Sequence, residues 1–127
     1  MAGIVPESKK EGFISHLSNT KKFKTQVPVP CLAVDDPDFS SDGKYWRGSS
    51  WHPTTYMVIK GLEQNGFNEK AKEISIKTVA ANFKLFKKTK TFWENLSPNK
   101  AKPGNPSQPD FCGWAGLSSV AIPREFL

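Results

Sequence analysis

A helical hairpin in the middle of the chain constrains the fold more than any other sequence feature. A first helix is predicted to start after Ser50, its N-cap, with Pro53 in the first turn. The residues that recur at the spacing of one helical face are Thr55, Val58, Ile59 and Leu62. Asn65-Gly66 then provides a left-handed stop. A second helix follows this short turn at once, so the two helices are expected to pack antiparallel.

The second helix is predicted over residues 69–88, with Asn68 as its N-cap. Its buried face is expected to consist of Ala71, Ile74, Thr78, Ala81 and Leu85. A shorter helix is predicted over residues 6–17, with Pro6 in its first turn. The apolar face of that helix carries Phe13, Ile14 and Leu17.

Two long stretches, residues 24–45 and 91–114, cannot be helical because of their prolines and glycines. The first is too apolar for a flexible linker, and a loop as long as the second is usually functional in a compact domain, so both are predicted to be ordered loops. Residues 116–127 begin with apolar residues and predict a last helix that Pro123 interrupts unless the helix begins there. No internal repeat and no clear β-strand alternation is found. The predicted class is mainly α, with about four helices and two long ordered loops.

Two clusters on loops that flank the helices combine aromatic rings with groups that form charged hydrogen bonds. They are YWRGSSW at residues 45–51 and FWEN at residues 92–95. Sugar-binding sites have this chemistry, because pyranose rings stack on aromatic faces and their hydroxyls bind charged groups. Hydrolysis of a glycosidic bond normally needs two carboxyl groups. From the residues alone, Glu94 is the best-placed candidate for one of them, and an ordinary solvated glutamate is the alternative.

Three segments resemble blocks of the six-hairpin (α/α)6 glycoside hydrolases, which include trehalases, processing α-glucosidases and mannosylglycerate-hydrolase-like enzymes. YWRGSSWHPTTYMVIKGLEQNGF is similar to their YWRG-x-x-W…KGL…YG block. TFWENLSP followed by PDFCGWAGL resembles their T-x-WENY-x-P…DF-x-GW-x-GL block. FISHLSNTKKFKTQVPVPCLAVDDPDF is similar to the segment that precedes both. The resemblance covers residues 11–122 in the same order and is nearest to the mannosylglycerate-hydrolase-like branch.

The resemblance implies that residues 1–127 form the C-terminal part of a catalytic (α/α)6 barrel. It implies inverting hydrolysis of an α-linked small glycoside or oligosaccharide, with Glu94 as the catalytic base that activates water. The substrate-binding residues that it implies are Tyr45, Trp46, Arg47, Trp51, Asp110 and Trp114. Core packing is the alternative for Trp51 and Trp114, and pinning of two loops is the alternative for Arg47.

Departures from the family pattern limit what the chain does alone. The family's general acid is an aspartate on an earlier hairpin, and no aspartate in this sequence occupies the matching motif. Cys31 stands where the family has a small residue, and Leu96 stands near the position of its usual aromatic residue. The chain is therefore expected to need the missing N-terminal hairpins as partners and to be inactive without them. The alternative is a truncated, non-catalytic carbohydrate-binding remnant.

Other features are given simpler interpretations. The net charge of +6 and the lysines around residues 84–90 fit a nucleic-acid patch, but a solvated lysine face is the favoured interpretation. No nucleic-acid or membrane partner, no metal and no cofactor is expected. Cys31 and Cys112 are expected to be free thiols, with one disulfide as the alternative, which favours a reducing cytoplasm without establishing the compartment. The sequon at Asn95 is attributed to chance because it adjoins Glu94.

Overall fold

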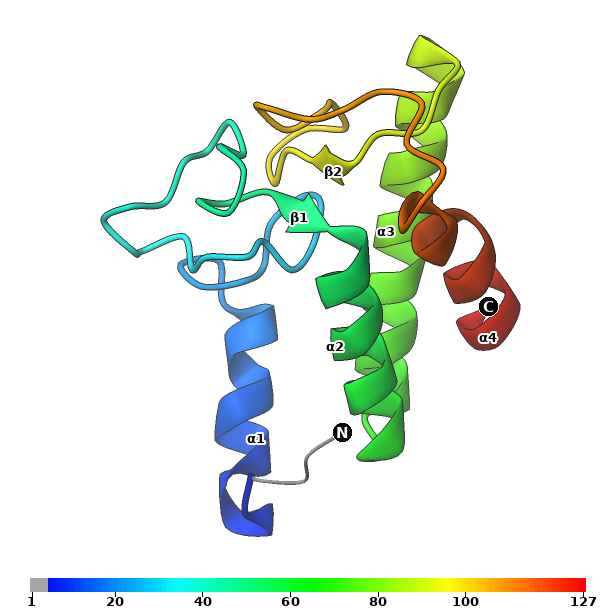
Figure 1. Ribbon diagram of the computed structural model, residues 1–127. Coiled ribbons are helices and arrows are strands. Elements are labelled where there is room, and N and C mark those ends of the chain that lie inside the picture. Colours follow the sequence, from blue (N-terminus) through cyan, green and yellow to red (C-terminus); the bar gives the residue numbers. More distant parts are fainter. Residues whose placement is uncertain (1–4) are drawn as a thin grey trace.

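An antiparallel pair of helices, α2 (His52–Gln64) and α3 (Asn68–Thr89), forms the centre of the molecule (Figure 1). The computed structural model describes residues 5–127. Gly66 links the two helices with a φ of 81°, the left-handed conformation predicted for it. The predicted face of α3 is buried along its whole length, and on α2 the buried residues include Thr55, Ile59 and Leu62. The central hairpin is therefore confirmed.

Both predicted N-caps were wrong. Ser50 belongs to a strand, and its Oγ donates a hydrogen bond to the carbonyl of Val27 at 3.0 Å, so Trp51 occupies the N-cap position of α2. Asn68 is the first residue of α3, and Phe67 occupies the cap position. A tertiary hydrogen bond to a distant loop has displaced the local capping interaction at Ser50.

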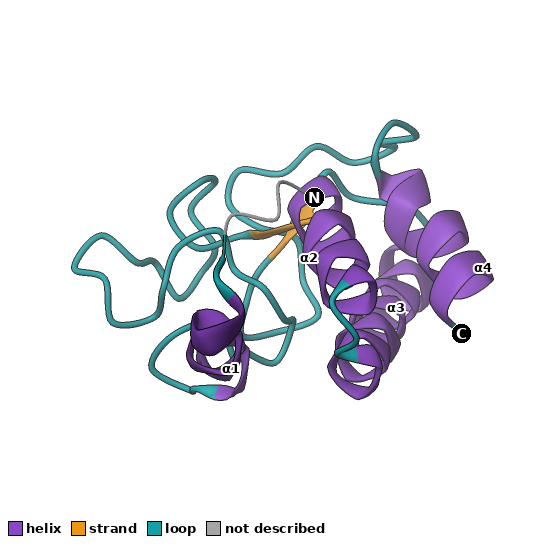
Figure 2. Ribbon diagram, turned by 90° about the horizontal axis from the view of Figure 1, so that it is seen from below, coloured by secondary structure: helices purple, strands orange, loops and turns teal. Residues whose placement is uncertain are grey.

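The helix α1 (Glu7–Ser15) ends in a 3-10 turn, η1 (His16–Ser18), close to the predicted range. None of the residues of α1 is buried. Figure 2, viewed along the helices, shows α2, α3 and α4 side by side and α1 standing apart from them. Ile14 of α1 and Leu17 of η1 are partly buried and pack against the core from outside.

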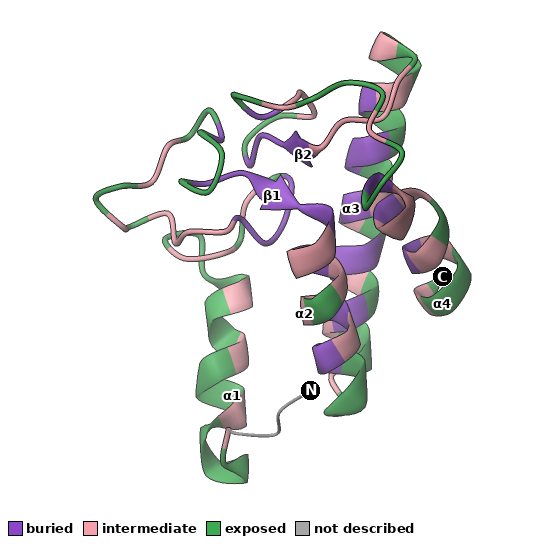
Figure 3. Cartoon of the chain, viewed as in Figure 1, coloured by how far each residue is buried: buried purple, intermediate pink, exposed green. Residues whose placement is uncertain are grey.

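The two long loops meet in a small antiparallel sheet that the sequence did not predict. Strand β1 (Ser50–Trp51) pairs with β2 (Asn95–Leu96), with Ser50 opposite Leu96. Single bridges from Pro30 to β1 and from Pro103 to β2 widen it. Figure 3 shows this sheet buried between the loops and the upper ends of α2 and α3.

The C-terminal segment packs on the hairpin as a π-helix, η2 (Leu117–Ala121), continued by α4 (Ile122–Phe126). Pro123 is the second residue of α4 and lies directly after the π-helix, so it stands within a continuous helical segment. Ile122 is fully buried, and Glu125 accepts a hydrogen bond from the Tyr56 hydroxyl at 2.8 Å. The predicted helix thus exists, and it neither ends nor begins at Pro123.

Two apolar clusters form the core. One lies between α2, α3 and α4 and consists of Val29, Ile59, Leu62, Ala71, Ile74 and Ile122. The other consists of Val27, Ala81, Leu85 and Leu96 and joins α3 to the loops. No helix within residues 5–127 is long and apolar enough to cross a bilayer. The mainly helical class with two long ordered loops is confirmed, and it is the arrangement expected of part of an (α/α)6 barrel.

Two isoleucines on the central helices provide a matched test of this core. Ile59→Ala should lower the free energy of unfolding by about 2–5 kcal/mol, because it opens a cavity at a fully buried position. Ile76→Ala is the control, since that side chain is 50% exposed on α3, and it should change stability by less than about 0.5 kcal/mol. Urea denaturation followed by circular dichroism measures both. Equal losses would mean that the cluster around Ile59 is not the core.

Candidate active site

The strand pairing brings together the two sequence clusters that were predicted to carry the chemistry. Trp51, at the end of the first cluster, lies directly opposite Asn95, which follows Glu94 in the second. The two clusters are more than forty residues apart in the sequence, and the whole α2–α3 hairpin separates them. Both therefore lie at the same end of the helices (Figure 1).

A chain of aromatic rings in contact runs through the first cluster towards Trp114. Trp46 stacks on Trp51 with ring centroids 4.0 Å apart and planes 8° apart. Tyr45 meets Trp51 edge-on at 4.8 Å, and Trp114 meets its other side at 6.0 Å. Trp51 is only 1% exposed, whereas Trp46 is 52% exposed. We call the stacked pair of Trp46 and Trp51 the aromatic platform. The buried indole of Trp51 supports it, and Trp46 presents an open ring face to solvent.

A tight turn holds Trp46 in this position. Gly48 has a φ of 135°, and a Cβ there would lie 2.5 Å from the carbonyl oxygen of Ser40. The backbone N–H of Gly48 donates to the Cys31 sulfur at 3.4 Å, and the Cys31 thiol donates to the Tyr45 carbonyl at 3.6 Å. Burial raises the pKa of the Cys31 thiol. Cys31 is therefore part of the support of the platform.

Arg47 is paired within the chain. Its Nη2 and Nε donate to Oδ1 and the carbonyl oxygen of Asp38 at 2.8 and 3.0 Å. Both side chains are exposed, so this ion pair adds little stability by itself. The contact joins the turn at Arg47 to the preceding loop, which is the loop-pinning alternative raised by the sequence.

Glu94 has a well-fixed backbone and a free carboxylate. Its N–H donates to the carbonyl of Gln108 at 2.9 Å, and its own carbonyl accepts from the Trp114 indole N–H at 2.9 Å. Within residues 5–127 the carboxylate makes no hydrogen bond or ion pair. The side chain is half-buried, so a group of this kind is available to a water molecule or a ligand.

Asp110 is tied to the start of the same loop. Its Oδ1 accepts from the Thr91 hydroxyl at 2.5 Å, and its N–H donates to the same hydroxyl oxygen at 2.9 Å. Asp110 also has a φ of 53°. The structure thus places Asp110 where it closes the loop that carries Glu94.

Two residues that the sequence analysis did not select also meet at this loop. His52 is buried at the start of α2, with Nε2 2.9 Å from the Trp93 carbonyl and Nδ1 2.7 Å from the Ser118 hydroxyl. Burial lowers the pKa of His52, partly offset by the hydrogen bond to Trp93. The position of His52 directly after the YWRGSSW cluster is the one signal in the sequence that points to it.

No three His, Cys, Asp or Glu side chains in the described part of the chain are grouped so as to hold a metal ion. Cys31 and Cys112 are free thiols, as predicted. Asn95, the residue of the predicted chance sequon, is fully buried and donates to the carbonyl of Pro106 at 3.2 Å. The features that remain at this end of the helices are one free carboxylate and an aromatic platform.

Helical hairpins with aromatic and carboxylate-bearing loops at one end define a chain of the six-hairpin glycosidase class. The chain belongs to the mannosylglycerate hydrolase MGH1-like glycoside hydrolase domain family, whose model matches residues 1–116. The family resemblance seen in the sequence is thereby confirmed.

Individual proteins are also similar to this chain. A Schizosaccharomyces pombe protein with the printed name "Probable mannosyl-oligosaccharide glucosidase" is 24% identical over 92% of this chain and 16% of its own length. An uncharacterized protein of Borreliella burgdorferi is 38% identical over 61% of this chain and 16% of its own length. The crystal structure of an uncharacterized conserved protein from Thermus thermophilus superposes with a TM-score of 0.71 and 20% identity, over 94% of this chain and 28% of that one. The chain therefore spans less than a third of the length of each of these three proteins.

Substitution of Gly48 tests the turn under the platform. Gly48→Ala should lower the free energy of unfolding by at least about 2 kcal/mol, because the new methyl group meets a backbone oxygen at a strained φ. Gly12→Ala is the control, since a Cβ there meets nothing within 4 Å and α1 should gain up to about 1 kcal/mol. Thermal denaturation with near-UV circular dichroism of the tryptophans measures both effects. An unaffected near-UV spectrum in Gly48→Ala would contradict this role of the turn.

Proposed function

We propose that this chain supplies the catalytic-base half of an inverting glycoside hydrolase that acts on an α-linked small glycoside or oligosaccharide. The observation that supports the proposal is the pairing of β1 with β2, in which Asn95, the neighbour of Glu94, lies opposite Trp51, the ring on which Trp46 stacks. A pyranose ring stacks on the exposed face of Trp46, and the Glu94 carboxylate takes a proton from the attacking water. Tyr45, Arg47, Asp110 and Trp114 form or support the walls of this sugar site.

The general acid is proposed to come from hairpins that precede these residues in a complete barrel. An inverting enzyme holds its two carboxyl groups far enough apart to admit a water molecule, roughly 6.5–9.5 Å. Family membership and the short span of the chain relative to its matches support this division of the site. Residues 1–127 are then the C-terminal part of the catalytic domain, and the upstream hairpins are their partner.

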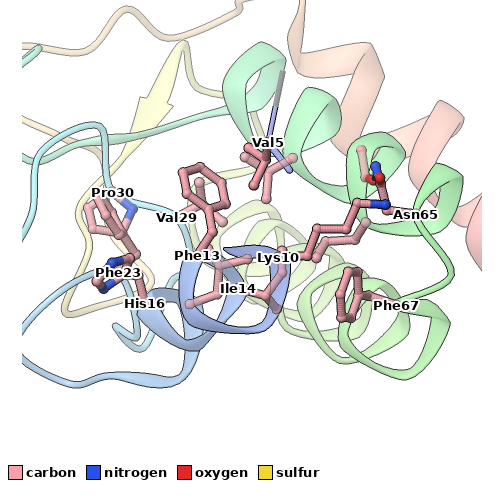
Figure 4. Close-up of a pocket in the computed structure, with 14 residues that line it drawn as sticks. Val5, Lys10, Phe13, Ile14, His16, Phe23, Val29, Pro30, Asn65 and Phe67 are labelled. Carbon is pink, nitrogen blue, oxygen red and sulfur yellow. Dashed lines mark hydrogen bonds between the residues drawn. The ribbon is translucent and has the colours of Figure 1, made fainter. Parts of the chain in front are cut away.

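An apolar cavity of about 510 Å³ between α1 and α2 supports the same arrangement. Figure 4 shows Phe13 and Ile14 from α1 and Phe67 from the far side of the cavity among its lining side chains. Phe13 is 61% exposed, although it belongs to the apolar face of α1. A helix of an upstream hairpin would cover this face, and burial of the apolar surface would stabilise the assembled barrel.

Replacement of Glu94 tests the catalytic proposal in a polypeptide that carries the upstream hairpins before residues 1–127. Glu94→Gln should lower kcat for α-glucosides or α-mannosides by about 10²–10⁴-fold, because the amide cannot accept a proton from water. Glu69→Gln, at an exposed carboxylate in the first turn of α3, is the control and should leave kcat unchanged. Proton NMR of the first-formed product should show inversion of the anomeric carbon. Full activity of Glu94→Gln, or retention of configuration, would refute the proposal.

A second candidate function is carbohydrate binding without catalysis by the chain alone. The observation in its favour is that Trp46 already stands 52% exposed on a rigid, buried base. A preformed aromatic face binds a sugar without first ordering its own side chains.

Titration of the isolated chain with methyl α-glucoside and methyl α-mannoside separates the two functions. The second function predicts saturable shifts of the tryptophan indole NMR signals in the millimolar range and no turnover. Trp46→Ala should abolish these shifts, and Phe83→Ala, at a 58% exposed ring on α3, should not. Equal loss in both variants would indicate non-specific association, and turnover by the isolated chain would exclude a purely binding role.

A further inference from the structure

A buried imidazole connects three segments behind the Glu94 loop. His52 is the first residue of α2 and is 1% exposed. Its Nε2 lies 2.9 Å from the carbonyl oxygen of Trp93, the residue that precedes Glu94. Its Nδ1 lies 2.7 Å from the hydroxyl of Ser118, which is fully buried in η2. One side chain therefore joins α2, the π-helix and the loop.

The chemistry of the two partners assigns the proton on this ring. The Trp93 carbonyl can only accept a hydrogen bond, so Nε2 must carry the hydrogen and donate it. In the neutral imidazole Nδ1 is then the acceptor, and the Ser118 hydroxyl donates to it. Both ring nitrogens are thereby satisfied by partners inside the protein.

The two peptide units that flank Glu94 have four backbone polar groups, and each of them has a hydrogen-bond partner. The Trp93 carbonyl accepts from His52, the Glu94 N–H donates to the Gln108 carbonyl, the Glu94 carbonyl accepts from the Trp114 indole, and the Asn95 N–H donates to the Ser107 hydroxyl. These contacts fix both peptide planes that flank the Cα of Glu94. The chain bends at Glu94, directly before β2, so these contacts take the place of helical hydrogen bonds there. Of the four partners, His52 is the one that belongs to a core helix.

We propose that His52 is a positioning residue for Glu94, holding the Trp93 carbonyl so that the carboxylate keeps its orientation beside the aromatic platform. The inference rests on the proposed function, in which Glu94 is the catalytic base. A base displaced by about 1 Å loses much of its effect, since proton transfer requires a close and directed hydrogen bond. Ser118 supports the role by fixing the ring and its tautomer.

Three replacements of His52 separate this role from simple packing. The amide nitrogen of Gln takes the place of Nε2 and can still donate to the Trp93 carbonyl. The amide nitrogen of Asn takes the place of Nδ1 and reaches only towards Ser118. Leu fills the space and makes neither hydrogen bond. A packing role would place His52→Leu, which fills the space, with His52→Gln and above His52→Asn. A positioning role instead places His52→Leu with His52→Asn, and both below His52→Gln.

Amide hydrogen exchange of the 127-residue chain gives a readout that is independent of catalysis. The Glu94 amide should exchange at least about tenfold faster in His52→Asn and His52→Leu than in the unmodified chain, and His52→Gln should restore slow exchange. The Ile59 amide in α2 is the internal control and should change little in any variant. If Glu94 exchanges at the same rate in the Gln and Asn variants, the proposal is wrong, and the comparison holds even if His52→Leu fails to fold.

Steady-state kinetics of the longer polypeptide, in which the upstream hairpins precede residues 1–127, completes the test. His52→Asn should lower kcat by about 100-fold while KM changes less than about threefold, and His52→Gln should recover most of kcat. Unchanged kcat in His52→Asn would overturn the positioning role, even with faster exchange at Glu94. A complete but inactive unmodified enzyme would instead refute the proposed function, and the exchange measurement would still decide whether His52 holds the loop.

Discussion

The antiparallel pairing of strands β1 and β2 is the constraint on which the rest of the structure depends. Ser50 and Trp51 lie against Asn95 and Leu96, and this contact closes a loop that contains the whole α2–α3 hairpin. Four residues of sheet contribute few hydrogen bonds, and an isolated pair this short would not persist in water. The burial of Trp51 and Leu96 stabilises it, because apolar area of this size is worth several kcal/mol. Prolines on both sides bridge to the strands and order the loops around them.

The end of the helices that carries the two clusters is held by many contacts, whereas the region around α1 is open. The Glu94 loop is held by His52, Gln108 and Trp114, and Trp46 is supported by a buried indole. In contrast, α1 has no buried residue, and an apolar cavity lies between it and α2. A well-held pair of loops together with an uncovered helix face fits the proposal that this chain is part of a larger barrel.

Local physics made the helical hairpin predictable. The period of Ile59 and Leu62 on α2, and of Ala71 to Leu85 on α3, specifies which face is buried before any partner is known. Gly66 is predictable because only a residue without a Cβ takes its φ readily. The two N-caps could not be found in this way. A serine hydroxyl can hydrogen-bond either to the start of a helix or to a distant carbonyl. In this structure the Ser50 hydroxyl donates to the distant carbonyl of Val27.

The sequence by itself determined the helices, the extent of the loops, the family and the clusters worth testing, because these follow from periodicity, proline and glycine chemistry and ordered motifs. Only the tertiary structure decided how those clusters are used. It buried Trp51 while leaving Trp46 open, tied Arg47 to Asp38, and set His52 against the Glu94 loop. Some of these contacts depend on the geometry of side chains that are not neighbours in the sequence. Others depend on packing from several segments at once. Neither kind of information is present in the local pattern of residues.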